Sequence, residues 1–241
     1  MTTVKALVIG HSTTASLRRI GPWFGQAGLD YELVFGGAGL PSSLEGYSAL
    51  IVLGGAPLPN EDDRFPWLVQ TRALTSQALE RGIPMLGICL GGQLLAYVGG
   101  GLVEHRKLRP EHGMTTITLE SAARHDPLFI ALPRRFSMTE NHVDHITSLP
   151  DQAVLLAHSD RAPVQAFRMG DCAWGLQFHP EVAAENIVDW DAEEQRSVEA
   201  DGFVWADIVR HAREAGAENA RLAQRLATRF AAICVEKAST R

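Results

Sequence analysis

The chain has 241 residues, of which 46% are hydrophobic and 21% are charged, and its formal net charge is −6. These values are ordinary for a globular protein, and the acidic balance disfavours a nucleic-acid partner, because binding phosphates requires a basic face. The cysteines Cys89, Cys172 and Cys234 are odd in number and far apart, which predicts free thiols in a reducing compartment and no disulfide framework.

The first residues carry no targeting or membrane signal. Met1 to Lys5 leads directly into the apolar run of residues 6–9, which is too short for the core of a signal peptide. The chain also lacks an apolar run of about 18 residues, the length that indicates a transmembrane helix. We therefore expect a cytoplasmic protein with no membrane partner.

The first half of the chain alternates short apolar runs with helical patterns. The apolar runs predict strands over residues 4–9, 31–35, 49–53 and 83–88. Helices are predicted over about 14–27, 66–81 and 91–98, with Pro66 in the first turn of the second helix and Gly82 just past its end. Strands that alternate with helices predict parallel βαβ units and an α/β fold around a mainly parallel sheet.

The second half has a different pattern. Strands are predicted over residues 114–119, 154–158, 164–169 and 173–178, with few helices between them, which favours a mixed or antiparallel edge. A C-terminal helix presents Leu222, Leu226, Phe230 and Ile233 on one face, with Cys234 beside them in the expected core. No repeat or long linker divides the chain, so we expect one domain over residues 1–241 with C-terminal helices from about residue 183.

A cysteine flanked by glycines is the first chemical signal. In Gly87-Ile88-Cys89-Leu90-Gly91 it stands between an apolar strand and a short helix, which is the arrangement of a nucleophile elbow with sulfur in place of oxygen. Such a turn exposes the sulfur at a helix N-terminus, where the free amides favour the thiolate. A buried structural cysteine beside a tight turn would produce the same short pattern, so the motif alone leaves both interpretations open.

Two further segments supply what a cysteine nucleophile requires. In residues 177–181, His179 follows an apolar strand and Glu181 follows two residues later, which provides a base and an acceptor that orients it. After the strand at 49–53, the backbone amides of Gly54 and Gly55 could form an oxyanion hole. The structural alternatives are a histidine that caps a strand end and a simple tight turn.

Together and in this order, the three motifs resemble those of the class I, triad-type glutamine amidotransferase family, and in particular its free-standing GMP-synthase-like members. The resemblance extends over about Val4 to Val182. It implies a three-layer, flavodoxin-like α/β fold. It also implies that Cys89 attacks the glutamine carboxamide and forms a γ-glutamyl thioester, that His179 transfers the protons, and that Glu181 orients His179. The oxyanion would lie against the amides of Gly55 and Leu90.

The resemblance also indicates where the substrate binds. It assigns Gly54, Gln93, Asn141 and His142 to the substrate, the last two in a loop over residues 141–144 that meets the amino-acid end of glutamine. Many members of the family carry His-Gly-Asp in this loop, so Val143 is a departure. Ala56 is a smaller departure, because many relatives pass directly from Gly-Gly to Pro.

Three functions fit these signals. The first is a glutaminase that passes ammonia to a separate synthase, because the chain has no Walker motif and no ATP-pyrophosphatase loop. The second is a hydrolase of γ-glutamyl conjugates, and the third is a non-catalytic binding module. No cofactor is expected, and no metal either, because the spacing of His105, His112, His142, Asp144 and His145 fits no dedicated metal site.

Overall fold

A nine-stranded sheet forms the centre of the molecule in the computed structural model, which describes residues 4–240. The first five strands in spatial order are parallel: β2 (Asp30–Phe35), β1 (Lys5–Gly10), β3 (Ala49–Val52), β4 (Met85–Ile88) and β11 (Ala173–Leu176). The remaining strands are antiparallel: β10 (Ala166–Met169), β9 (Val154–His158), β6 (Glu111–Leu119) and β7 (Arg135–His142). The α/β fold with a mixed edge is therefore confirmed.

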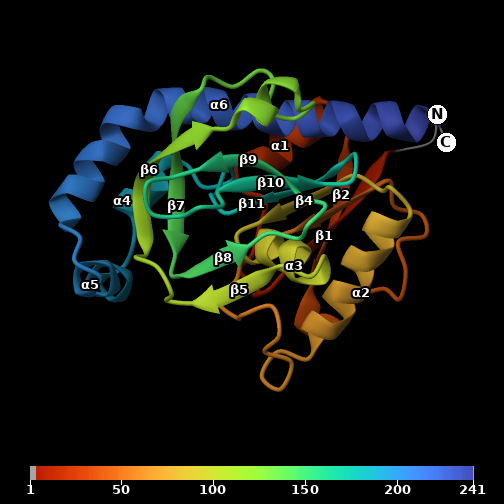
Figure 1. The fold of residues 1–241 in the computed structure, drawn as a ribbon, viewed down its shortest axis with the longest axis horizontal. Coiled ribbons are helices and arrows are strands. Elements are labelled where there is room, and N and C mark those ends of the chain that lie inside the picture. The colour runs from red at the N-terminus through yellow and green to blue at the C-terminus, as the bar shows by residue number, and fades with distance from the viewer. Residues whose placement is uncertain (1–3, 241) are drawn as a thin grey trace.

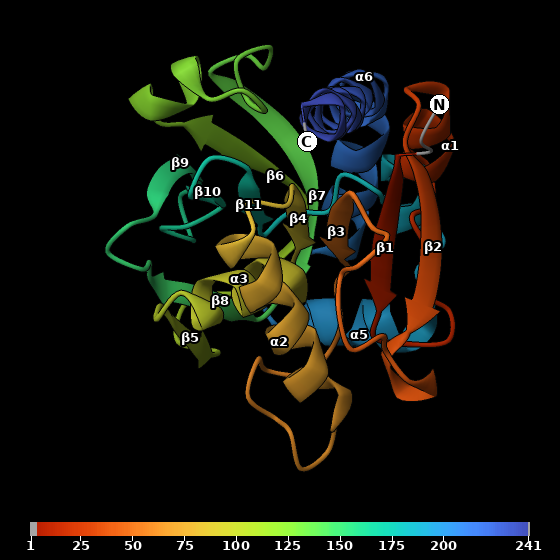
Figure 2. The same ribbon diagram turned by 90° about the vertical axis from the view of Figure 1, so that its right-hand side faces the viewer.

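Helices cover both faces of the sheet and make three layers (Figures 1 and 2). One face carries α1 (Ile20–Gln26) and the long α6 (Trp205–Ser239), and the other carries α2 (Trp67–Glu80) and α3 (Leu90–Val98). The short helices α4 (Ala184–Val188) and α5 (Ala192–Ala200) precede α6 and pack against it, α4 more extensively. A separate ribbon pairs β5 (Leu102–His105) with β8 (Asp144–Ser148), and two 3₁₀ turns, η1 (Gly36–Ala38) and η2 (Ser121–His125), lie in loops.

The structure differs from the sequence predictions in one helix, in the strands of the second half and in the loop expected at residues 141–144. The helix expected over 14–27 begins only at Ile20, because Arg18 has a positive φ of 42° that no α-helix contains. The strands β5, β7 and β8 were not predicted, and residues Asn141 and His142, expected in a loop, end β7. In β7 the polar residues Thr139 and Glu140 are buried, which hides the apolar alternation that marks a strand.

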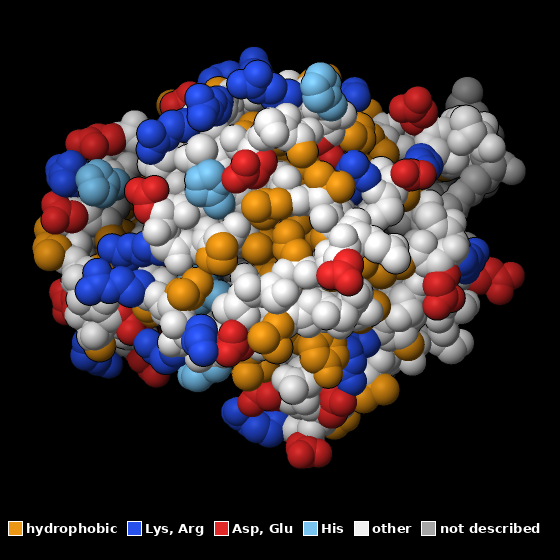
Figure 3. All heavy atoms as spheres, in the orientation of Figure 1, with side chains coloured by type: hydrophobic (Ala, Val, Ile, Leu, Met, Phe, Trp, Pro, Cys, Tyr) orange, Lys and Arg blue, Asp and Glu red, His pale blue; other side chains and the backbone are white. Residues whose placement is uncertain are grey.

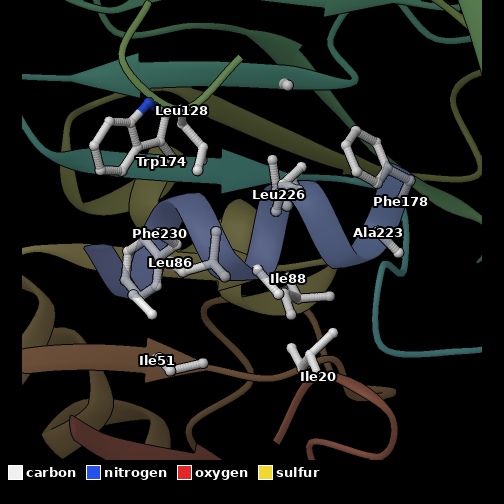
Figure 4. Packing of buried hydrophobic residues seen from close by; sticks show 14 of the residues in the cluster. Ile20, Ile51, Leu86, Ile88, Leu128, Trp174, Phe178, Ala223, Leu226 and Phe230 are labelled. Atoms are coloured by element: carbon white, nitrogen blue, oxygen red, sulfur yellow. The ribbon is translucent and has the colours of Figure 1, made fainter. Parts of the chain in front are cut away.

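The larger apolar core lies between the sheet and the helices α1 and α6 (Figure 4). Leu222, Leu226, Phe230 and Ile233 all lie in this core, as the helical spacing predicts, and so does Cys234. The Phe230 ring lies 6.0 Å from that of Phe24 and 6.2 Å from that of Trp174, centroid to centroid, so it joins both helices to the sheet. Burying each large side chain of this kind stabilises the fold by about 1.5–3 kcal/mol.

A second apolar core fills the opposite side of the sheet. There Leu68 and Leu74 of α2 pack with Leu94 and Leu95 of α3 and with the buried strands. Because β4 and α3 both pack into the apolar cores, the short connection between them is fixed at both of its ends. This connection contains Cys89.

The surface carries both signs of charge. On the face shown in Figure 3, Lys and Arg are dispersed among Asp and Glu, apart from a basic row along the upper edge, and hydrophobic side chains gather near the middle. Among the described residues, no helix combines the length and the apolar character needed to cross a bilayer. Apart from the basic row, the face shown in Figure 3 has no extended region of one charge.

Replacing Phe230 with Ala should show how far α6 supports the fold. The side chain is fully buried, so the substitution removes its burial and leaves a cavity, and we expect the free energy of unfolding to fall by about 3–5 kcal/mol. Val69→Ala, at a position more than half exposed on α2, should change it by less than about 0.5 kcal/mol. Urea unfolding measures both, and equal effects would contradict the assigned role of α6.

Candidate active site

A cavity of about 560 Å³ opens at the carboxyl ends of the parallel strands. This is the edge where open α/β sheets form their sites, because the loops that follow successive strands converge there. The segments that line it are the loop after β1, the loop after β3, the β4–α3 turn, the end of β7, the loop after β11, and α4–α5. The predicted residues Gly54, Gly55, Cys89, Asn141, His179 and Glu181 are all on its wall.

Cys89 lies at the turn between β4 and α3 in a strained conformation. Its φ of 51° and ψ of −109° lie outside the regions that side chains favour, which costs about 1–3 kcal/mol and persists only where the surroundings enforce it. Gly91 is required here, because a Cβ at this position would overlap the carbonyl oxygen of Val52 in the neighbouring strand. The turn therefore presents the sulfur at the N-terminus of α3.

His179 is fixed by a buried carboxylate. Its Nδ1 lies 2.6 Å from Oε1 of Glu181, and because a carboxylate only accepts, Nδ1 carries the hydrogen and Nε2 is left for the sulfur. The backbone N–H of His179 donates to the carbonyl of Thr139 at 2.8 Å. Burial alone would lower the pKa of His179, but Glu181 and then Cys89 outweigh it, so this pKa lies well above its ordinary value.

The Gly54-Gly55 turn passes close to these groups. A Cβ on Gly54 would lie 2.9 Å from Cε1 of His179, and one on Gly55 would lie 3.0 Å from Cδ2 of Leu90. Leu90 is the first residue of α3, so its backbone N–H has no acceptor within the helix. The structure thus brings together the Gly54-Gly55 turn and the start of α3, which carry the amides predicted to form an oxyanion hole.

Two predicted substrate residues lie behind the cavity wall. Gln93 is 2% exposed, and its Nε2 donates to the carbonyl of Asp144 at 3.2 Å and to Oε1 of Gln177 at 3.3 Å. Gln177 in turn donates to the Cys89 sulfur at 3.6 Å. His142 is also buried, with Nδ1 3.0 Å from the same Asp144 carbonyl. Neither Gln93 nor His142 is on the wall of this cavity.

A polar network is buried beneath the site. Glu111, Glu140 and His142 offer ligand atoms within 4.8 Å of one another, the one such group among residues 4–240 that could hold a metal ion. Both Glu111 oxygens already accept hydrogen bonds, from Ser159 at 2.7 Å and from Gln165 at 2.6 Å, so this carboxylate is held by neighbouring side chains of the protein. Burial, and then repulsion from Glu111, hold the pKa of Glu140 well above its usual range, which favours the neutral carboxyl.

Several residues at the site were not found by sequence reasoning. They include Gln177, the loop of residues 12–18, and the wall formed by Asn186, Asp189, Trp190 and Glu194. The loop could have been found from the rule that sites gather after parallel strands, and Gln177 begins the segment that contains His179. No local pattern marks the α4–α5 residues, because their position depends on how the chain returns over the sheet.

The family model of class I glutamine amidotransferases matches residues 28–187, well over half of the chain. The chain belongs to this family. A solved glutamine amidotransferase from Thermotoga maritima is similar over 95% of this chain and 98% of its own, with a TM-score of 0.82 and 28% identity. The sequence-based resemblance is therefore confirmed.

The chain is also similar to curated relatives, and it covers only part of each of them. It is 42% identical over 133 residues to the glutamine-hydrolysing GMP synthase of Thermomicrobium roseum, covering 55% of this chain and 23% of that protein. It is 41% identical over 104 residues to one subunit of the glutamine-hydrolysing GMP synthase of Saccharolobus solfataricus, covering 43% of this chain and 53% of that polypeptide. The chain thus spans about a quarter of the first relative and about half of the second.

The contact between His179 and Glu181 predicts how fast Cys89 reacts with alkylating agents. Glu181→Gln removes the negative charge that raises the pKa of His179, so the imidazolium that stabilises a thiolate becomes less favourable at pH 7. We expect iodoacetamide to modify Cys89 at least about tenfold more slowly in this variant. Peptide mass spectrometry measures the rate, and the matched control is Glu185→Gln at an exposed position of α4. Equal rates in the two variants would contradict the assigned coupling.

Proposed function

We propose that this chain is a cysteine-dependent glutaminase, which hydrolyses the side-chain amide of glutamine to glutamate and ammonia. The observation that supports it best is the strained Cys89 at the head of α3, together with His179 held 2.6 Å from a buried Glu181. Family membership supports the same reaction. A binding module without turnover would need neither the strained turn nor the buried ion pair, which favours an enzyme.

In the first half of the reaction the Cys89 thiolate attacks the carboxamide carbon, and the C=O electrons move to the oxygen. The backbone amides of Gly55 and Leu90 are the proposed donors to this oxyanion. The tetrahedral intermediate collapses by expelling nitrogen, which takes the proton of His179 Nε2 and leaves as ammonia. A γ-glutamyl thioester on Cys89 remains, and His179 is neutral.

In the second half a water molecule attacks the thioester. His179 Nε2 accepts a proton from this water, the C–S bond breaks, and glutamate leaves while Cys89 returns to the thiolate. Glu181 keeps the Nδ1 hydrogen in place throughout and stabilises each imidazolium that forms. The raised pKa of His179 suits both steps, because the imidazolium must donate in one and re-form in the other.

The substrate contacts divide into two groups. Gly54 and Asn141 are on the cavity wall and are proposed to meet the substrate directly. Gln93 and His142 both hydrogen-bond the Asp144 carbonyl from behind, so we assign them to holding the β7–β8 segment in position. This division keeps the four predicted residues in the site but gives the two buried ones a supporting role.

We further propose that the ammonia is used by a separate synthase polypeptide. Several relatives are named as one subunit of a glutamine-hydrolysing GMP synthase, and the chain matches only 23% of a full-length GMP synthase. A second polypeptide that docks over the cavity would receive the ammonia before it reaches bulk water. Co-purification from the native cells would identify this acceptor.

The first test is glutamate release from glutamine by the purified chain. Cys89→Ala removes the nucleophile, so we expect the rate to fall at least about a thousandfold. Cys172→Ala, which removes a buried thiol elsewhere, should keep the wild-type rate. If glutamine alone is not turned over, the assay is repeated with co-purified partners, and glutamate release that survives Cys89→Ala would exclude the mechanism.

One observation favours a second function, the hydrolysis of γ-glutamyl conjugates. The cavity extends beyond Cys89 to the α4–α5 segment, where Asp189, Trp190 and Glu194 line it. This region gives room for a leaving group larger than ammonia, and its two carboxylates and one aromatic ring would suit an amine with a distant positive charge. The thioester chemistry would be the same.

A panel of γ-glutamyl amides separates the two functions. For a glutaminase we expect kcat/KM for glutamine to exceed that for γ-glutamyl alkylamides at least about tenfold. Higher values for the conjugates would select the second function. In that case Glu194→Gln, on the cavity wall, should lower conjugate turnover, whereas Glu193→Gln on the same exposed helix, away from the wall, should not.

A further inference from the structure

Arg19 lies beside the proposed catalytic pair, His179 and Glu181, but is not on the wall of the cavity. It immediately precedes α1, and its side chain is half-buried. Its Nε donates to the carbonyl oxygen of Pro180 at 2.8 Å, and Pro180 is the residue between His179 and Glu181. The guanidinium therefore holds the backbone segment that sets the spacing of the pair.

A second hydrogen bond connects this guanidinium to α6. Nη2 of Arg19 donates to Oδ1 of Asn219 at 2.7 Å, and Nδ2 of Asn219 donates to the carbonyl oxygen of Ser137 in β7 at 3.3 Å. Because arginine only donates and a carbonyl oxygen only accepts, the two contacts together fix the orientation of the Asn219 amide. Asn219 is 1% exposed, so the packing of α6 against the sheet holds the guanidinium in place.

The charge of Arg19 also acts on the carboxylate that orients His179. Burial lowers the pKa of Arg19 to about 10, and Glu181 and then Glu185 oppose this shift, so the guanidinium stays charged at pH 7. Oε1 of Glu181 faces His179, whereas its Oε2 and Nη1 of Arg19 are buried and form no hydrogen bond within residues 4–240. The attraction between the two charges restrains the Glu181 side chain in the position that His179 requires.

Thr139 of β7 supports the same turn at its two ends. Its carbonyl oxygen accepts from the N–H of His179 at 2.8 Å, and its hydroxyl donates to the carbonyl oxygen of Val182 at 3.0 Å. These two bonds hold residues 179 and 182 but not the peptide group of Pro180. Arg19 supplies the contact at Pro180, so the turn is supported from β7 and from the start of α1.

We propose that Arg19 is a positioning residue: held by Asn219, it fixes the turn that keeps Glu181 against the proposed base. This inference rests on the proposed function and adds to it a residue that is not on the cavity wall. The family model matches residues 28–187, so Arg19 and Asn219 both lie outside the matched region. Support for the catalytic pair therefore comes from segments on either side of that region.

The test measures how fast iodoacetamide modifies Cys89, a reaction that needs no substrate. Arg19→Met keeps an unbranched apolar side chain but removes the charge and every donor. We expect Cys89 to react at least about fivefold more slowly in this variant, because a less firmly held Glu181 stabilises the imidazolium less. Arg229→Met is the matched control, because Arg229 of α6 donates to another prolyl carbonyl oxygen, that of Pro127, at 2.7 Å on the exposed surface.

A double-mutant cycle distinguishes positioning from a general loss of stability. If Arg19 acts through Glu181, Arg19→Met should slow the reaction less than about twofold once Glu181→Gln is present. Equal slowing in both backgrounds, or none in Arg19→Met alone, would overturn the inference and leave the glutaminase intact. If thermal denaturation shows that Arg19→Met does not fold, Arg19→Lys replaces it in the cycle, because one amine on a shorter side chain cannot reproduce both contacts of the guanidinium.

Glutamine turnover gives a second measurement. Since Arg19 is not on the cavity wall, Arg19→Met should lower kcat at least about fivefold and leave KM within about twofold. A rise in KM alone would overturn the inference. If the wild-type chain releases no glutamate, with or without co-purified partners, the proposed function fails, while the alkylation cycle still decides whether Arg19 positions Glu181.

Discussion

The backbone conformation of Cys89 is the constraint on which the site depends. A positive φ at a residue with a side chain is unfavourable, so it persists only because β4 and α3 are each fixed by their own apolar packing. The two cores on opposite faces of the sheet therefore do more than stabilise the fold. They hold β4 and α3 in place on either side of this turn, and the turn presents the Cys89 sulfur to the cavity.

The other residues of the proposed catalytic site approach this sulfur from separate segments of the chain. The proposed oxyanion segment follows β3, the proposed base follows β11, and the wall beside them ends β7. All three strands terminate at one edge, so ordinary sheet topology collects them without long connections. Beneath them, buried polar residues such as Glu140 occupy space that apolar side chains fill elsewhere. Burial raises the pKa of Glu140 well above its usual range, which favours the neutral carboxyl over an unpaired buried charge.

Local signals allowed much of this arrangement to be predicted. Three patterns depend only on residues that are close in sequence: the glycines around Cys89, the two-residue spacing of His179 and Glu181, and the helical repeat that ends at Ile233. The structure places all of these residues as expected. The strand β7 escaped prediction because its buried Thr139 and Glu140 look like surface residues until their partners are known. The contribution of Trp190 to the cavity was equally hidden, because it depends on the path of the chain after the last strand.

The long helix α6 limits how far the chain can be shortened from its C-terminus without exposing the core. The family model ends at residue 187, before α6 begins at Trp205, yet this helix supplies one wall of the larger core and rests on β6 and β7. A chain truncated at residue 187 would keep Cys89, His179 and Glu181 but would expose to water the apolar face of the sheet that α6 covers. We therefore expect the smallest unit that folds to extend well past the residues that the family model matches.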